Sequence, residues 1–227
     1  MARPKSIDNT PSKRRPLALS ILLCTLCTYT LANDQPQHRN DLPNSYPQER
    51  QTVAQRQYPW RSIGSLSIAG RQFCTATLIS ETQVLTAAHC LWNQDTDDWY
   101  PASFIHFLAG YQQGEYLGHS TAISISPNRR YQFSSPPKLE SLRHDWALVT
   151  LKESLGKTLG YIPLRRVAID GAPTQTANTL QLAGYRQDRP EVLSVAKRCR
   201  RANKHNAPDT LEHFLIHSCE ALSGDSG

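Results

Sequence analysis

Apolar and polar residues alternate with a short period along most of the chain after residue 58. The segments "SLSIAG" and "FCTATLIS" alternate on either side of Gly70-Arg71-Gln72, a pattern that predicts a hairpin. Further short runs are rich in aliphatic, β-branched or aromatic residues and are bounded by Gly, Pro, Asn or Asp: 103–111, 120–126, 145–151, 179–185, 192–197 and 213–219. Many short strands without a long helical period predict an all-β barrel or sandwich.

Two stretches lack this strand pattern. Residues 33–57 are rich in Pro, Gln and Asn and have almost no apolar period, which predicts a linker or pro-segment before a folded domain over 58–227. Residues 127–144 form the longest irregular stretch inside that domain. A loop of such length in a compact domain is usually functional or disordered.

Residues 1–32 have the layout of a signal peptide. The basic "PSKRRP" precedes the apolar run 17–32, and Thr30-Leu31-Ala32 forms a small-x-Ala cleavage site. The run is shorter than the ~20 residues that span a bilayer as a helix, although a retained membrane anchor is the alternative. We therefore expect cleavage near Ala32, a secreted or periplasmic protein, and no stable membrane insertion afterwards.

The positive charge of the chain lies mostly in this leader. The 227 residues carry a net charge of +6, and residues 1–32 contribute four of those six charges. The remainder is too weakly basic to indicate a nucleic-acid partner. A chain of this length can form one large domain or two small ones.

Four cysteines follow the leader: Cys74, Cys90, Cys199 and Cys219. An even number in an exported chain indicates disulfides, and four cysteines allow three pairings. Proximity in the sequence favours Cys74–Cys90 and Cys199–Cys219. A metal site is the competing hypothesis, but the mature region contains no Cys-x-x-Cys or His-x-x-x-His cluster, so we expect no metal and no cofactor.

Two residues at strand ends are candidates for acid–base chemistry. His89 follows an apolar strand end and two alanines in "VLTAAHC", where a disulfide at Cys90 would immobilise it, as a general base requires. Asp145 opens the strand "DWALVTL", where an acid can be buried and still orient an imidazole. The alternatives are a structural histidine and a turn residue. Asp97 and Asp98 are rival acids, but they lie in a polar run.

Ser226 lies in "SGDSG", residues 223–227. A Gly-x-Ser-Gly turn places the hydroxyl on a tight bend, where the backbone N–H groups of Gly224 and Ser226 could converge on an oxyanion. An ordinary turn is the alternative. The chain order His89, Asp145, Ser226 is the chymotrypsin-type order, which differs from that of α/β-hydrolases and subtilisins.

From about residue 58 to its end the chain resembles trypsin-like (chymotrypsin-fold) serine proteases. The resemblance is greatest to the bacterial branch that includes glutamyl endopeptidases. It is carried by "YPWRSIG", "FCTATLISETQVLTAAHC", "HDWALVTL", "LAGYRQDRP" and "HSCEALSGDSG". It implies two six-stranded Greek-key β-barrels, with the second incomplete in this chain.

The resemblance also implies the mechanism. Ser226 would attack the scissile carbonyl of a protein or peptide substrate, His89 would transfer the proton, and Asp145 would hold the imidazole. The backbone N–H groups of Gly224 and Ser226 would form the oxyanion hole. Cys74–Cys90 would brace the histidine, and Cys199–Cys219 would tie down the loop that leads to the serine.

The chain departs from the family in several places. Trypsin-like zymogens usually mature to an Ile-Val-Gly-Gly-like amino terminus, whose amine pairs with the acid before the serine. Asp225 is present but that motif is not, and cleavage after Arg50 or Arg56 stays open. Ala221 stands where glutamyl-specific relatives often carry Thr or Ser, and Glu220 leaves a preference for basic side chains open.

Two functions therefore compete. The first is a serine endopeptidase, whose remaining strands and substrate pocket the resemblance implies beyond Gly227. The second is a non-catalytic, truncated homologue that acts as a binding module or is an inactive fragment.

Overall fold

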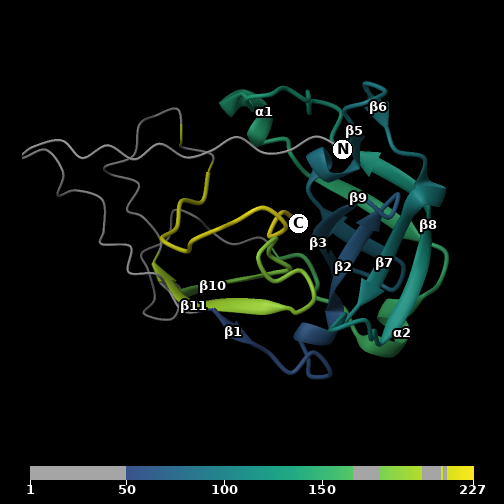
Figure 1. Cartoon of the computed structure of the whole chain (residues 1–227), viewed down its shortest axis with the longest axis vertical. Coiled ribbons are helices and arrows are strands. Elements are labelled where there is room, and N and C mark those ends of the chain that lie inside the picture. The colour runs from purple at the N-terminus through teal and green to yellow at the C-terminus, as the bar shows by residue number, and fades with distance from the viewer. Residues whose placement is uncertain (1–49, 166–178, 201–210, 212–213) are drawn as a thin grey trace, which may run out of the picture. The chain divides into compact units, whose positions relative to one another are not determined.

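Six strands of the chain close into a barrel (Figure 1). The computed structural model describes residues 50–165, 179–200, 211 and 214–227. The barrel order is β2-β3-β4-β9-β8-β7, and neighbouring strands are antiparallel. The strands are β2 (Ile63–Ile68), β3 (Gln72–Leu78), β4 (Gln83–Thr86), β7 (Ile105–Ala109), β8 (Gly118–Pro127) and β9 (Ala147–Leu151). The hairpin predicted around Gly70 is confirmed as β2–β3.

The barrel is filled by the apolar side chains that alternate along its strands. In β7 and β9 every second residue is buried, as the period-2 pattern requires. The fully buried side chains of this core include Leu66, Ile68, Leu78, Val84, Ile105, Phe107 and Val149. Their burial is the main stabilising contribution to this part of the molecule.

A second, smaller sheet joins a strand from before the barrel to two strands from after it. Its order is β1-β11-β10, from β1 (Gln51–Thr52), β10 (Thr179–Gly184) and β11 (Ser194–Arg200). β1 lies inside the range 33–57 that the composition predicts as a linker or pro-segment, and in the structure it pairs with β11. A small cluster of Ile63, Tyr185 and Leu193 packs beside this sheet.

The remaining elements are short. The helices are η1 (Trp60–Ser62), η2 (Ala88–Leu91), η3 (Ala102–Phe104), α1 (Leu139–Leu142) and α2 (Leu155–Leu159), and β5 (Trp92–Asn93) pairs with β6 (Asp98–Trp99). The all-β prediction is thus confirmed. Within the described ranges, we find no helix long and apolar enough to cross a membrane.

One predicted strand is wrong. The described part of 213–219 forms no strand, because its polar groups pair locally and with the end of β11. The backbone N–H of Cys219 donates to His217 Nδ1, and that of Ser218 donates to the carbonyl of Arg200. The pairing at Cys219 takes the place of a continuous ladder.

Candidate active site

The pairing of β4 with β9 brings His89 and Asp145 together. Thr86 at the end of β4 lies opposite Ala147 at the start of β9. His89 follows Thr86 by one tight turn, in η2, and Asp145 precedes Ala147 by two residues. Antiparallel pairing places the end of one strand beside the start of the other, so the register of the barrel decides this contact.

Asp145 holds His89 with both carboxylate oxygens. Oδ2 lies 2.6 Å from His89 Nδ1, and Oδ1 accepts the backbone N–H of His89 at 2.8 Å. The Asp145 side chain is 12% exposed, whereas that of His89 is 36% exposed. The carboxylate is therefore largely shielded from water, and the imidazole keeps an open side.

A disulfide fixes the chain around the histidine. Cys74 in β3 is bonded to Cys90, with Cα atoms 6.3 Å apart. Within the described part of the chain, Cys74, His89 and Cys90 also form the one group whose atoms could converge on a metal. Because a disulfide sulfur is not a thiolate ligand, this group does not fit a metal site.

The loop that carries Ser226 is held against the barrel by Thr75 of β3. The backbone N–H of Thr75 donates to the carbonyl of Ser226 at 2.8 Å. Its hydroxyl donates to the carbonyl of Gly224 at 2.7 Å and accepts the backbone N–H of Tyr185 at 3.0 Å. The serine loop is thus connected to the same strand that carries Cys74.

Position 224 requires glycine, because the loop leaves no room for a side chain there. Its φ is +92°, and a Cβ atom there would overlap the carbonyl oxygen of Tyr185. Among the described residues, the N–H groups of Gly224 and Ser226 have no acceptor, whereas the N–H between them, of Asp225, donates to Leu222. Two backbone donors beside the serine are therefore free to bind an anionic oxygen.

The structure does not bring the serine into a hydrogen bond with the histidine. Within the described ranges, the imidazole of His89 bonds to Asp145 alone, and the Ser226 contact with η2 is through its carbonyl near the Cys90 sulfur, at 4.0 Å. Catalytic hydrogen bonds are often long without substrate and tighten when it binds.

A cavity of about 310 Å³ opens beside His89 and Asp145. Its apolar wall comes from the irregular stretch predicted at 127–144, through Tyr131, Phe133 and Leu142. Burial, with a smaller effect of the Asp145 charge, raises the pKa of Tyr131 to about 12. The phenol is therefore neutral near the carboxylate.

Comparison with known proteins assigns the family. The sequence model of the Trypsin family matches residues 49–227. The chain belongs to the Trypsin family. It is 26% identical over 182 residues to coagulation factor XII of Sus scrofa, an alignment that covers 70% of this chain and 28% of that protein. The chain thus spans well under half of the length of that relative.

A solved Glu endopeptidase in complex with MPD has a similar fold to this Trypsin-family chain. The TM-score is 0.58 at 21% identity, over 78% of this chain and 77% of the other. At this identity the likeness concerns the fold alone, and together with the family match it establishes a chymotrypsin-like architecture around the closed barrel.

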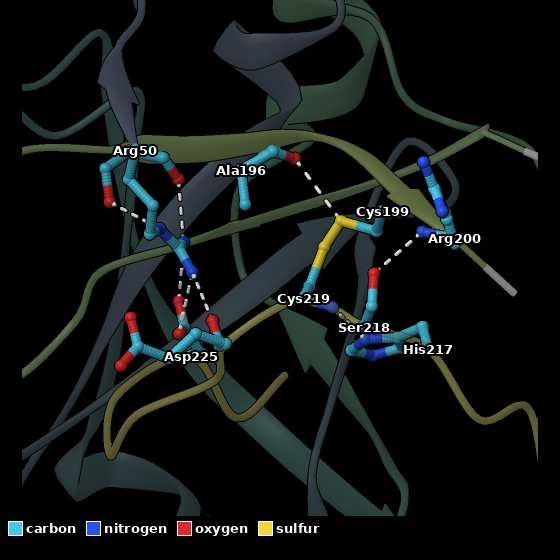
Figure 2. Close-up of a disulfide and its surroundings, with 10 residues drawn as sticks. Arg50, Ala196, Cys199, Arg200, His217, Ser218, Cys219 and Asp225 are labelled. Carbon is cyan, nitrogen blue, oxygen red and sulfur yellow. Dashed lines mark hydrogen bonds and ion pairs between the residues drawn. A yellow bond between two sulfur atoms is a disulfide. The ribbon is translucent and has the colours of Figure 1, made fainter. Parts of the chain in front are cut away.

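Both disulfides favoured by sequence proximity are present in this Trypsin-family chain. Cys199 is bonded to Cys219, with Cα atoms 5.0 Å apart, and so connects β11 to the segment before the serine (Figure 2). The next residue, Glu220, lies 3.6 Å from the guanidinium of Arg186. The same guanidinium is bonded more closely to Asp188, at 3.0 Å, so Glu220 shares its cation with a second acid.

The sequence did not identify two residues that hold the serine loop of this Trypsin-family chain. Thr75 gave no signal, because a threonine in a strand is ordinary. For Arg50 the sequence held an indirect signal, which lies in Asp225. The sequence has Asp225 without an Ile-Val-Gly-Gly-like motif, and Asp225 is buried in the structure, where a carboxylate requires a cation. The structure provides Arg50, whose guanidinium lies 2.7 Å from Asp225.

Proposed function

We propose that this protein is a serine endopeptidase that cleaves protein or peptide substrates through an acyl-enzyme. Ser226 attacks the scissile carbonyl. His89 takes the proton and later donates it to the leaving amine, and Asp145 keeps the imidazole in the required tautomer. The backbone N–H groups of Gly224 and Ser226 stabilise the oxyanion.

The observation that carries this proposal is the two-point contact of Asp145 with His89, at 2.6 Å and 2.8 Å. A carboxylate at Nδ1 leaves the proton-accepting Nε2 directed away from it and stabilises the imidazolium that forms in catalysis. The partial exposure of the imidazole and the adjacent cavity support access for a substrate.

We place the enzyme in the branch of glutamyl endopeptidases, on the quoted sequence motifs and the fold of the solved neighbour. The cavity beside His89 has an apolar wall of Tyr131, Phe133 and Leu142. We propose that it receives an apolar substrate side chain close to the scissile bond, because burial of apolar surface there contributes to binding.

We also propose that the protein is exported. Residues 1–32 would act as the signal peptide, and 33–57 as a linker or pro-segment before the protease domain; residues 1–49 lie outside the described ranges. Two disulfides support an oxidising compartment, since they persist there. The last part of the segment, from Arg50, packs on the domain.

The second candidate is a non-catalytic homologue that binds protein partners. The observation in its favour is that Ser226 and His89 do not form a hydrogen bond with each other in the described chain. It predicts an unreactive serine, whereas the protease proposal predicts a reactive one.

A fluorophosphonate that labels activated serines separates the two candidates on the full-length natural protein. We expect labelling of the wild type, none for Ser226→Ala, and turnover of a protein substrate reduced about 10⁶-fold by that change. Ser223→Ala is the matched control, because Ser223 lies exposed in the same loop. A wild type that stays unlabelled, or label that persists in Ser226→Ala, would refute the proposal.

A further inference from the structure

Arg50 and Asp225 form a buried ion pair next to the serine. The guanidinium donates to both carboxylate oxygens, Nη2 to Oδ1 at 2.7 Å and Nη1 to Oδ2 at 2.9 Å. Each side chain is only 3% exposed. Figure 2 shows the side chain of Arg50 directed at Asp225. The triad chemistry does not use this pair, so it requires its own explanation.

The remaining donors of Arg50 are also satisfied. Nε donates to Ser194 Oγ at 3.1 Å, Nη2 donates to the Ser194 carbonyl at 2.9 Å, and Nη1 donates to the Glu220 carbonyl at 3.5 Å. With the two bonds to Asp225, all the N–H groups of a guanidinium have an acceptor. Arg50 therefore joins β11 to the serine loop at three residues: Ser194, Glu220 and Asp225.

The ion pair fixes the loop at the point where its free amides lie. Asp225 stands between Gly224 and Ser226, whose N–H groups have no acceptor in the described chain. Its Oδ2 also accepts the N–H of Leu222 at 3.1 Å. The backbone of Gly184 lies so close that a Cβ atom would overlap Oδ1. The carboxylate thus fits one position, and that position orients the peptide groups on either side of it.

Burying a carboxylate without a partner is strongly unfavourable. Without the guanidinium, Asp225 would turn toward water and the flanking peptides would move with it. We propose that Arg50 is a positioning residue: it holds the amides of Gly224 and Ser226 in place by pairing with Asp225, so that the loop forms in a chain with no new amino terminus. This inference rests on the proposed protease function.

The ion pair has a consequence for processing. Cleavage after Arg50, which the sequence leaves open, would require a side chain that is 3% exposed to leave Asp225 and enter a protease.

The first test compares Arg50→Ala with the wild type in the full-length protein. We expect kcat to fall about 10²–10³-fold, the loss of an oxyanion donor, with a smaller change in KM. Guanidinium chloride at millimolar concentration, far below that which unfolds proteins, should restore part of the rate by filling the vacated site. Arg56→Ala is the matched control, since Arg56 is exposed in the same segment.

Arg50→Ala leaves a buried charge and can fail to fold, so a second variant is needed. Arg50→Met/Asp225→Asn removes both charges, which a fold tolerates better than one unpaired ion. We expect it to melt close to the wild type and still be slow with substrate and with fluorophosphonate. If this variant is as fast as the wild type, Arg50 has a structural role only and the inference is overturned.

The amino terminus is tested by mass spectrometry of the labelled enzyme. We expect fluorophosphonate to label chains in which the peptide bond after Arg50 is intact. Labelling confined to chains cut after Arg50 would contradict the inference. A wild type that is not labelled at all would refute the protease function, whereas equal labelling of wild type and Arg50→Ala would refute this inference alone.

Discussion

The barrel and the serine loop position their parts of the candidate site in different ways. In the barrel, His89 and Asp145 meet because β4 and β9 are paired, and each strand has a neighbour on both sides. In the serine loop, Ser226 lies outside regular structure and is held by individual contacts from Thr75 and Arg50.

This difference has a consequence for tolerance to substitution. A closed barrel distributes its stability over many buried side chains, so its register survives the loss of a single contact. The loop depends on a few hydrogen bonds and one ion pair, so single changes there should remove activity while the barrel stays folded. The predictions below test that contrast.

Among the variants that test this contrast, the largest effect should come from the acid on the barrel side. Asp145→Asn keeps the shape of the side chain but puts an amide where His89 Nδ1 needs an acceptor, which favours the wrong tautomer. We expect kcat to fall about 10⁴-fold, as it does in chymotrypsin-type enzymes, with little change in melting temperature. Steady-state kinetics and thermal unfolding measure both. Asp95→Asn, at an exposed acid in the same half, should behave as the wild type.

Two glycine-to-alanine variants compare the serine loop with the barrel directly, one by its effect on activity and the other by its effect on stability. Gly224→Ala puts a Cβ atom against the Tyr185 carbonyl and should lower kcat about 10²–10³-fold by displacing the free amides, while the barrel melts normally.

Gly64→Ala is the counterpart in β2, where the Cβ atom would meet Leu108 and Phe107. We expect a loss of about 1–3 kcal/mol in the free energy of unfolding, with unchanged turnover per site titrated by fluorophosphonate. If Gly224→Ala instead destabilises the whole chain as much as Gly64→Ala, the two regions are one cooperative unit and the contrast fails.

The smallest effect should come from Tyr185, which joins the loop side to the barrel. Its hydroxyl donates to the Tyr111 carbonyl at 2.9 Å, and burial raises its pKa above the ordinary value of 10.0. Tyr185→Phe should lower the free energy of unfolding by about 1 kcal/mol at pH 7.

The phenol ionises in the unfolded chain near pH 10 but stays protonated in the folded one. The contribution of the Tyr185 hydroxyl to the free energy of unfolding is thus complete below pH 10. It is lost as pH rises from there toward the pKa of the folded state. Denaturant unfolding of both proteins at pH 7 and pH 11 measures this loss. The free energy of unfolding of the wild type should exceed that of Tyr185→Phe by less at pH 11 than at pH 7. An equal difference at both pH values would contradict the assigned shift.

Much of the fold could be predicted because its signals are local. Alternation in 145–151 and 103–111 gave β9 and β7, since a strand with one buried face needs a period of two. Where the alternation of apolar and polar residues predicted the wrong structure, contacts with distant parts of the chain decided the outcome. The apolar run 213–219 forms no strand in its described part, and the polar segment around Gln51 does form one, because pairing with β11 decided it.

The sequence alone nominated His89, Asp145 and Ser226 and both disulfides, because residue types in strongly patterned contexts carry that information. Their catalytic roles stay predictions. Only the tertiary structure decided which groups meet: Asp145 with His89 through strand register, and Arg50 with Asp225 across 175 residues. A buried charge can be paired by any cation that the fold brings near, so its partner follows from the packing of the chain and not from a local pattern.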